Sequence, residues 1–163
     1  MSDNFLPLDK NPTNFQQVKN LLAQQQLISI TPEAQESITK CRRYLDDKMK
    51  GSDELFYGIN TGFGFFFFFQ IDKTQLQELQ NNLIKSHACG MGEEVPGDIV
   101  KLMMAFKIKS LSYGHSGVQV GTVERLVDMY NNDVLPVIFT QGSLGASGDL
   151  APLSHLSLPL LGL

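Results

Sequence analysis

A glycine-rich stretch that runs directly into a helix start limits most strongly what this chain can fold into. Residues 142–153 read Gly-Ser-Leu-Gly-Ala-Ser-Gly-Asp-Leu-Ala-Pro-Leu. Asp149 is a residue type that favours helix N-caps, and Pro152 falls in the first turn, where its missing N–H costs little. The pattern therefore predicts a tight turn over residues 146–148, at the positive end of a helix dipole.

The triplet Ala146-Ser147-Gly148 can also carry chemistry on its own backbone. If the turn folds back far enough, the amide nitrogen of Gly148 can attack the carbonyl carbon of Ala146, closing a five-membered ring with loss of one water. Loss of the Ser147 hydroxyl as a second water leaves an exocyclic methylene on an imidazolone. That group is an electrophile that no ordinary side chain supplies. Glycine suits position 148 because it has no side chain to crowd the attacking nitrogen.

Three other interpretations of the same stretch compete with ring closure. The simplest is a glycine-rich turn before a capped helix, and for the triplet taken alone it is favoured. A phosphate-binding loop is disfavoured because no Gly-Lys-Ser/Thr follows. A serine nucleophile elbow requires glycine at position 149, where this chain has aspartate.

A second glycine-rich segment, Tyr57-Gly-Ile-Asn-Thr-Gly-Phe-Gly64, places a tyrosine in a loop. Taken alone, it predicts a tight structural turn with Tyr57 half-buried. The glycines would also let the loop bring the phenol close to a ligand. Because the ordinary pKa of a tyrosine is about 10, a basic role near neutral pH requires positive charge or hydrogen-bond donors nearby.

Phenylalanines at residues 65–69 follow this loop directly. They indicate either a hydrophobic plug or an altered stretch of sequence. If exposed, such a run favours aggregation.

Two histidines lie near the ends of predicted helices. His87, in Ser86-His-Ala-Cys-Gly90, would ordinarily be a partner of the helix dipole. An imidazole at such a place can also hydrogen-bond a substrate, and a pocket built for that bond strongly rejects analogues that lack it. We interpret His155 as a core histidine whose hydrogen bonds are satisfied.

Together these segments resemble the aromatic amino acid lyases, the family of the histidine, phenylalanine and tyrosine ammonia-lyases. The run from Gly142 to His155 resembles the family signature, and the Tyr57 loop resembles its second signature nearly letter for letter. The Ser86-His87 pair is similar to the selectivity position of histidine-specific members. The phenylalanine run departs from the family, which has mixed, partly polar residues there. The resemblance covers the chain from about Thr31 to its end.

The resemblance implies a methylidene-imidazolone cofactor (MIO) made from Ala146, Ser147 and Gly148, with Asp149 in support and no metal or nucleotide. It also implies that Tyr57 is the general base. The implied reaction is loss of ammonia from L-histidine to give urocanate.

His87 would orient the imidazole of that substrate. Some tyrosine-specific relatives also carry Ser-His, so a tyrosine ammonia-lyase is one alternative. A non-catalytic assembly module that never forms MIO is another.

The implied fold is mainly α, the N-terminal segment of a long-helix ammonia-lyase fold with irregular glycine-rich active-site loops. We expect residues 1–163 to be a single N-terminal portion of a larger lyase. Adaptor helices would occupy residues 1–50, and the motifs lie in residues 51–163. Family members are longer and build each active site from three subunits of a tetramer. We therefore expect a homotetramer for the full-length protein and no activity for this portion alone.

The composition argues against several other partners. The net charge is −4, and the chain has no basic patch or stripe that would favour nucleic acid or an anionic membrane. No run reaches the roughly 18 apolar residues of a membrane span. Residues 1–10 do not resemble a signal peptide, so we expect a cytoplasmic protein.

Apolar residues at three- and four-residue spacing predict most of the helices. In residues 98–113 the lysines at 101, 107 and 109 are expected to point outward. Residues 1–13 are expected to be irregular. Short extended segments are predicted over residues 28–30 and 136–139, and helices over residues 14–26, 32–50, 74–89, 98–113 and 122–132, with another that begins at Leu150.

Overall fold

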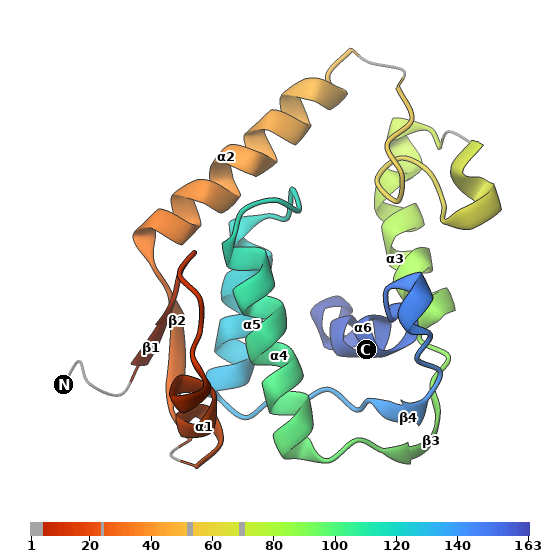
Figure 1. The fold of residues 1–163 in the computed structure, drawn as a ribbon. Helices are drawn as coiled ribbons and strands as arrows, with labels where there is room; N and C mark the ends of the chain where they lie inside the picture. The colour runs from red at the N-terminus through yellow and green to blue at the C-terminus, as the bar shows by residue number, and fades with distance from the viewer. Residues whose placement is uncertain (1–4, 24, 52–53, 69–70) are drawn as a thin grey trace. The chain divides into compact units, whose positions relative to one another are not determined.

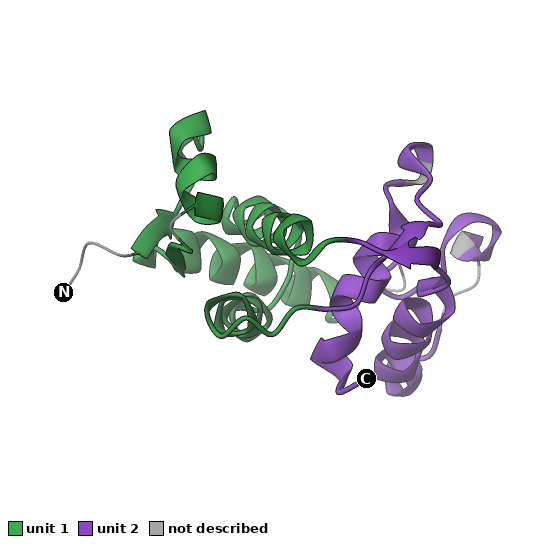
Figure 2. Cartoon of the chain, turned by 90° about the horizontal axis from the view of Figure 1, so that it is seen from below, with its two compact units in different colours: residues 1–50, 96–135 green, residues 51–95, 136–163 purple. Residues whose placement is uncertain are grey.

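The computed structural model describes residues 5–23, 25–51, 54–68 and 71–163 (Figure 1). The chain divides into two compact units, each built from two separate stretches of sequence. The first unit comprises residues 1–50 and 96–135, and the second comprises residues 51–95 and 136–163 (Figure 2). The expectation of a mainly helical fold is confirmed by the elements of both units.

The first unit contains a small parallel sheet covered by helices. Its elements are β1 (Phe5–Leu8), α1 (Phe15–Ala23), β2 (Leu27–Ile30), α2 (Pro32–Met49), α4 (Gly97–Ser112) and α5 (Val120–Asn131). The α5 helix packs on β2. The Asn131 side chain forms hydrogen bonds with both the backbone N–H and the backbone carbonyl of Ile28. Its Oδ1 accepts from the Ile28 N–H, and its Nδ2 donates to the Ile28 carbonyl, each at 2.9 Å.

The expectation that residues 1–13 are irregular is wrong for β1. Phe5–Leu8 pairs with Leu27–Ile30 in parallel register, and its side chains alternate between exposed and buried. Leu6 and Leu8 face the core, which is the period-two pattern of a half-buried strand. Pro7 obscured this pattern, although proline is tolerated in a strand at the edge of a sheet.

The helices of the first unit follow the sequence prediction closely. The predicted cap is confirmed, because the Thr31 hydroxyl oxygen accepts from the Ala34 N–H at 3.2 Å and Pro32 is the first helical residue. The outward direction expected for Lys109 is wrong. Its side chain is buried, and its ammonium group donates to the backbone carbonyls of Asp9 and Asn11.

The second unit holds every motif that the sequence analysis singled out. Its α3 helix (Leu76–His87) packs against α6 (Leu150–Ser157), and a ribbon of β3 (Met91–Glu94) and β4 (Phe139–Gln141) lies beyond the end of α3. The remaining elements are the 3₁₀ helices η1 (Gly64–Phe68), η2 (Lys73–Gln75), η3 (Gly145–Ser147) and η4 (Leu158–Leu161).

The β3–β4 ribbon is antiparallel and joins two motif-bearing segments. Met91 pairs with Gln141 and Glu94 pairs with Phe139, so the residues after His87 lie beside those before the 146–148 triplet. The sequence analysis did not predict β3, because its four residues are exposed and show no alternation. The predicted helix start at Leu150 is confirmed, and α6 gives way to 3₁₀ geometry before Pro159.

Within the described part of the chain, no helix is both long enough and apolar enough to cross a membrane.

The buried phenol of Tyr130 makes the first unit sensitive to high pH. Burial, and then the Asp133 carboxylate, raise the pKa of Tyr130 from its ordinary value of 10.0 to about 12. Between these values the unfolded chain loses this proton while the folded chain keeps it. The free energy of unfolding should therefore fall as the pH rises from about 10 to about 12.

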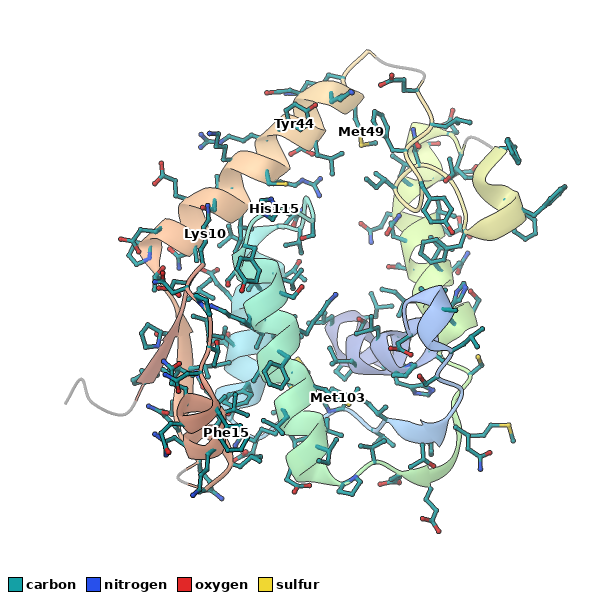
Figure 3. All side chains as sticks on the ribbon, viewed as in Figure 1. Lys10, Phe15, Tyr44, Met49, Met103 and His115 are labelled. Carbon is teal, nitrogen blue, oxygen red and sulfur yellow. The ribbon has the colours of Figure 1, made fainter. Side chains whose placement is uncertain are left out.

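Urea denaturation across this pH range checks this prediction. Tyr130→Phe should reduce the decline, whereas Tyr44→Phe should leave it intact, because Tyr44 lies on α2 with 67% of its surface exposed (Figure 3). An equal slope in the wild type and Tyr130→Phe would contradict the assignment.

Candidate active site

Tyr57 lies on a tight turn at the start of the second unit. The carbonyl of Phe56 accepts hydrogen bonds from the N–H groups of Ile59 and Asn60, at 3.0 and 3.2 Å. The Tyr57 side chain is 57% exposed, which is more than the half-buried position expected from the sequence. Its phenol oxygen accepts from the Gly64 N–H at 2.9 Å.

Two polar side chains hold this turn together from inside. Asn60 accepts from the Phe56 N–H at 2.7 Å and donates to the Glu54 carbonyl at 2.8 Å. Thr61 is fully buried, and its hydroxyl oxygen accepts from the Gly58 N–H at 3.2 Å. The sequence analysis missed both residues. Their side chains form local bonds to the backbone of a kind that asparagine and threonine commonly make in turns, and this tendency was the available signal.

His87 ends α3 with a defined ring orientation. Its Nδ1 lies 2.8 Å from the Leu83 carbonyl oxygen. Because a carbonyl only accepts, we assign the proton to Nδ1, which leaves Nε2 as an acceptor in the neutral ring. His87 therefore binds a carbonyl at the end of its helix, as expected of an ordinary histidine there. Its Nε2 can accept a hydrogen bond from another partner.

Phe63 lies between the two proposed site side chains. Its ring centroid is 5.6 Å from that of Tyr57, and it meets His87 edge-on at 5.3 Å. His87 and Phe63 also line a pocket of about 420 Å³. The described residues that line it are Gly62, Phe63, Phe66, Ile71, Leu79, Leu83, Ser86 and His87, and this lining is mainly apolar.

The described side chains of the phenylalanine run do not form a hydrophobic plug, which was one of the two interpretations of the sequence. Phe65 and Phe68 are largely exposed on η1. Phe66 is also mostly exposed, although it contributes to the pocket wall. Phe69 lies outside the described residues.

The first two residues of the triplet end the 3₁₀ helix η3, and Ala146 and Gly148 are exposed. The Gly148 N–H donates to the Gly145 carbonyl at 3.2 Å, and Gly148 has a left-handed backbone with φ of 82°. A Cβ atom at position 148 would have no neighbour within 4 Å. Glycine is therefore favoured here by the backbone conformation, and crowding does not require it. The Gly148 nitrogen is thus bonded to the Gly145 carbonyl, and the Ala146 carbonyl that ring closure would involve is the next one along the chain.

Asp149 occupies the N-cap position of α6, but the prediction that its side chain caps the helix is wrong. Its backbone is left-handed, with φ of 57°, and the side chain makes no capping bond. The carboxylate instead accepts from the Ser143 hydroxyl, which closes the glycine-rich stretch around the triplet.

His155 joins the segments that surround the triplet and His87. It is buried, its Nε2 accepts from the Gly90 N–H at 2.9 Å, and its ring meets Phe139 edge-on. The interpretation of His155 as a satisfied core histidine is thus confirmed. Two glycines permit this contact. A Cβ at Gly90 would lie 3.0 Å from that nitrogen, and one at Gly142 would lie 3.1 Å from the Gly90 Cα.

Among the described residues, no group of three or more histidine, cysteine, aspartate or glutamate side chains is placed to hold a metal ion.

Comparison with known proteins identifies close similarity over nearly the whole chain. Residues 13–163 match the family model described as aromatic amino acid lyase. The histidine ammonia-lyase of Deinococcus radiodurans is 47% identical over 150 residues, which are 92% of this chain and 28% of that protein. That of Macrococcus caseolyticus is 45% identical over 157 residues, or 96% of this chain and 31% of that protein. The chain thus spans less than a third of the length of these curated relatives.

Solved structures show the same fold. The histidine ammonia-lyase of Trypanosoma cruzi superposes with a TM-score of 0.82 at 35% identity, covering 97% of this chain and 30% of that one. The tyrosine aminomutase of Streptomyces globisporus superposes with a TM-score of 0.89 at 30% identity, covering 96% and 29%.

The close contact at Gly90 predicts a sharp difference between two glycine substitutions. Gly90→Ala should lower the free energy of unfolding by about 1–3 kcal/mol, because the added methyl group meets His155 and the Gln141 carbonyl. Gly145→Ala adds a methyl group in open space and should change stability by no more than about 0.5 kcal/mol. Urea denaturation measures both, and equal midpoints for the two variants would contradict the prediction.

Proposed function

The chain belongs to the aromatic amino acid lyase family, and on that premise we propose that it is part of an ammonia-lyase that converts L-histidine to urocanate and ammonia. The curated relatives described above are histidine ammonia-lyases, at 45% and 47% identity. Tyr57, His87 and the Ala146–Gly148 triplet all lie in the second unit.

The orientation of His87 is the observation that favours a substrate whose ring carries a hydrogen-bond donor. With its Nδ1 proton donated to the Leu83 carbonyl, Nε2 is a hydrogen-bond acceptor on a residue that lines the apolar pocket. The N–H of a substrate imidazole is a matching donor. A phenylalanine side chain offers no such donor, and it would leave the polar nitrogen unpaired.

Tyr57 is the proposed base, which removes a proton from the β-carbon of the substrate. The Gly64 N–H already points at its phenol oxygen at 2.9 Å, so a donor is in place for the anionic form. Because the β-proton is only weakly acidic, its removal and the departure of nitrogen must be matched in geometry. The shared contact with Phe63 holds Tyr57 and His87 in one neighbourhood, as such matching demands.

The triplet fits the MIO group that the family uses. Its left-handed glycine, the bond between Gly148 and Gly145 and the open space around it all suit a backbone that folds back on itself. The carboxylate of Asp149 supports this turn through Ser143. The MIO group would supply an electrophilic methylene for the amino nitrogen of the substrate. The chemistry requires Ala146, Ser147 and Gly148 as its source.

The proposal concerns the whole protein. This chain covers less than a third of the length of the curated relatives. We expect that protein to be a cytoplasmic homotetramer and the 163-residue chain alone to release no urocanate. A tyrosine ammonia-lyase is the second candidate, because a phenol O–H would also satisfy the acceptor on His87. In the whole protein, faster turnover of L-tyrosine than of L-histidine would favour that alternative.

Intact-mass measurement tests whether the triplet matures. The purified chain should be lighter than its sequence by two water molecules, and Ser147→Ala should abolish this loss because it removes the hydroxyl that leaves. Ser116→Ala removes a serine outside the triplet and should keep it. An unmodified mass for the wild-type chain would overturn maturation in this chain and favour the non-catalytic module.

A further inference from the structure

One side chain of α3 is bonded to the backbone of the Tyr57 loop. The Nε2 of Gln80 lies 2.9 Å from the Gly58 carbonyl oxygen and 3.0 Å from that of Ile59. Both acceptors are carbonyls, so only the amide NH₂ group of Gln80 can make these bonds, and its two protons match the two acceptors. The bonded carbonyls belong to the two residues that directly follow Tyr57.

A second glutamine on the same helix shows that this arrangement is specific. Gln77 is exposed, and its Nε2 donates to Asn81 one turn further along α3. That pair stays within its own helix, as surface residues four positions apart commonly do. Gln80 is half-buried and reaches a loop more than twenty residues earlier in the chain.

The position of Gln80 along α3 links the two proposed site residues. His87 follows it by about two helical turns on the same rigid element. The loop carries Gly58 and Gly64, both with left-handed backbone, and such glycines give a loop many alternative conformations. A bond from the helix to the residues beside Tyr57 selects one of these conformations relative to His87.

We propose that Gln80 is a positioning residue that holds the Tyr57 loop against α3 and thereby sets the placement of the phenol relative to His87. Its importance for the reaction rests on the proposed function, in which Tyr57 is the base and His87 orients the substrate. Packing adds to the bond. Phe63 contacts both rings and lies so close to Gly58 that a Cβ there would meet it at 2.5 Å.

Amide hydrogen exchange in the 163-residue chain tests the proposal through two opposite substitutions. Gln80→Glu keeps the shape of the side chain but turns the donor toward the carbonyls into a carboxylate that repels them. It should speed exchange at the Ile59, Asn60 and Gly64 N–H groups about tenfold. Gln80→Lys keeps a donor of similar reach and should restore slow exchange. Gln77→Glu is the matched control and should resemble the wild type.

Two further readouts separate positioning from general loss of stability. The nuclear Overhauser effect between the Tyr57 and Phe63 rings should weaken in Gln80→Glu and return in Gln80→Lys. The N–H groups of Gly90 and Val95 are bonded elsewhere in the same unit, and their exchange should not change. Loop exchange unchanged in Gln80→Glu, or faster by the same factor at Gly90 and Val95, would overturn the proposal.

The result is independent of the mass of the triplet. Loop exchange that depends on Gln80, together with an unmodified mass, would support the positioning role, overturn maturation of the triplet in this chain and favour the non-catalytic module. A mass lighter by two waters, together with loop exchange that does not change in the Gln80 variants, would support maturation of the triplet and overturn the positioning role.

Discussion

The contact among Gly90, Gly142 and His155 is the constraint on which the second unit depends. At both glycines the backbone lies so close to its neighbours that a side chain would have to displace atoms 3.0–3.1 Å away. The contact lets the segment that follows His87 pair with the segment that precedes the triplet. The contact lies at the end of the β3–β4 ribbon, because Gly90 precedes Met91 and Gly142 follows Gln141, its partner.

This constraint also determines which hydrogen bond the buried His155 ring makes. Its Nε2 must accept from the Gly90 N–H, so in the neutral ring the proton lies on Nδ1. His87 has the same tautomer but different partners, because its Nδ1 proton is donated to the Leu83 carbonyl of its own helix and its Nε2 is left as an acceptor. His155 thus uses Nε2 within the unit, whereas the Nε2 of His87 is the atom that we propose for binding the substrate.

Much of the fold follows from local patterns, and what was missed follows from contacts between distant residues. Helices with a strong apolar period and a clear cap, such as α2 after Thr31, are predictable. The β3 strand is not, because it is exposed on every residue and its pairing with β4 depends on the glycine contact. Asp149 has the right residue type for a cap, but its left-handed backbone directs the carboxylate to Ser143. Gln80 gave no signal at all, since a glutamine on a helix is ordinarily a solvent-facing residue.

The interleaving of the two units has a consequence for synthesis. The backbone N–H and carbonyl of Ile28 are hydrogen-bonded to Asn131, which leaves the ribosome more than a hundred residues later. The first unit therefore cannot complete its fold until residues 96–135 have been synthesised, and residues 51–95 of the other unit are synthesised before them. Contacts of such high sequence separation slow folding. They leave the apolar faces of β2 and α2 open during translation, when the exposed phenylalanines of η1 emerge next.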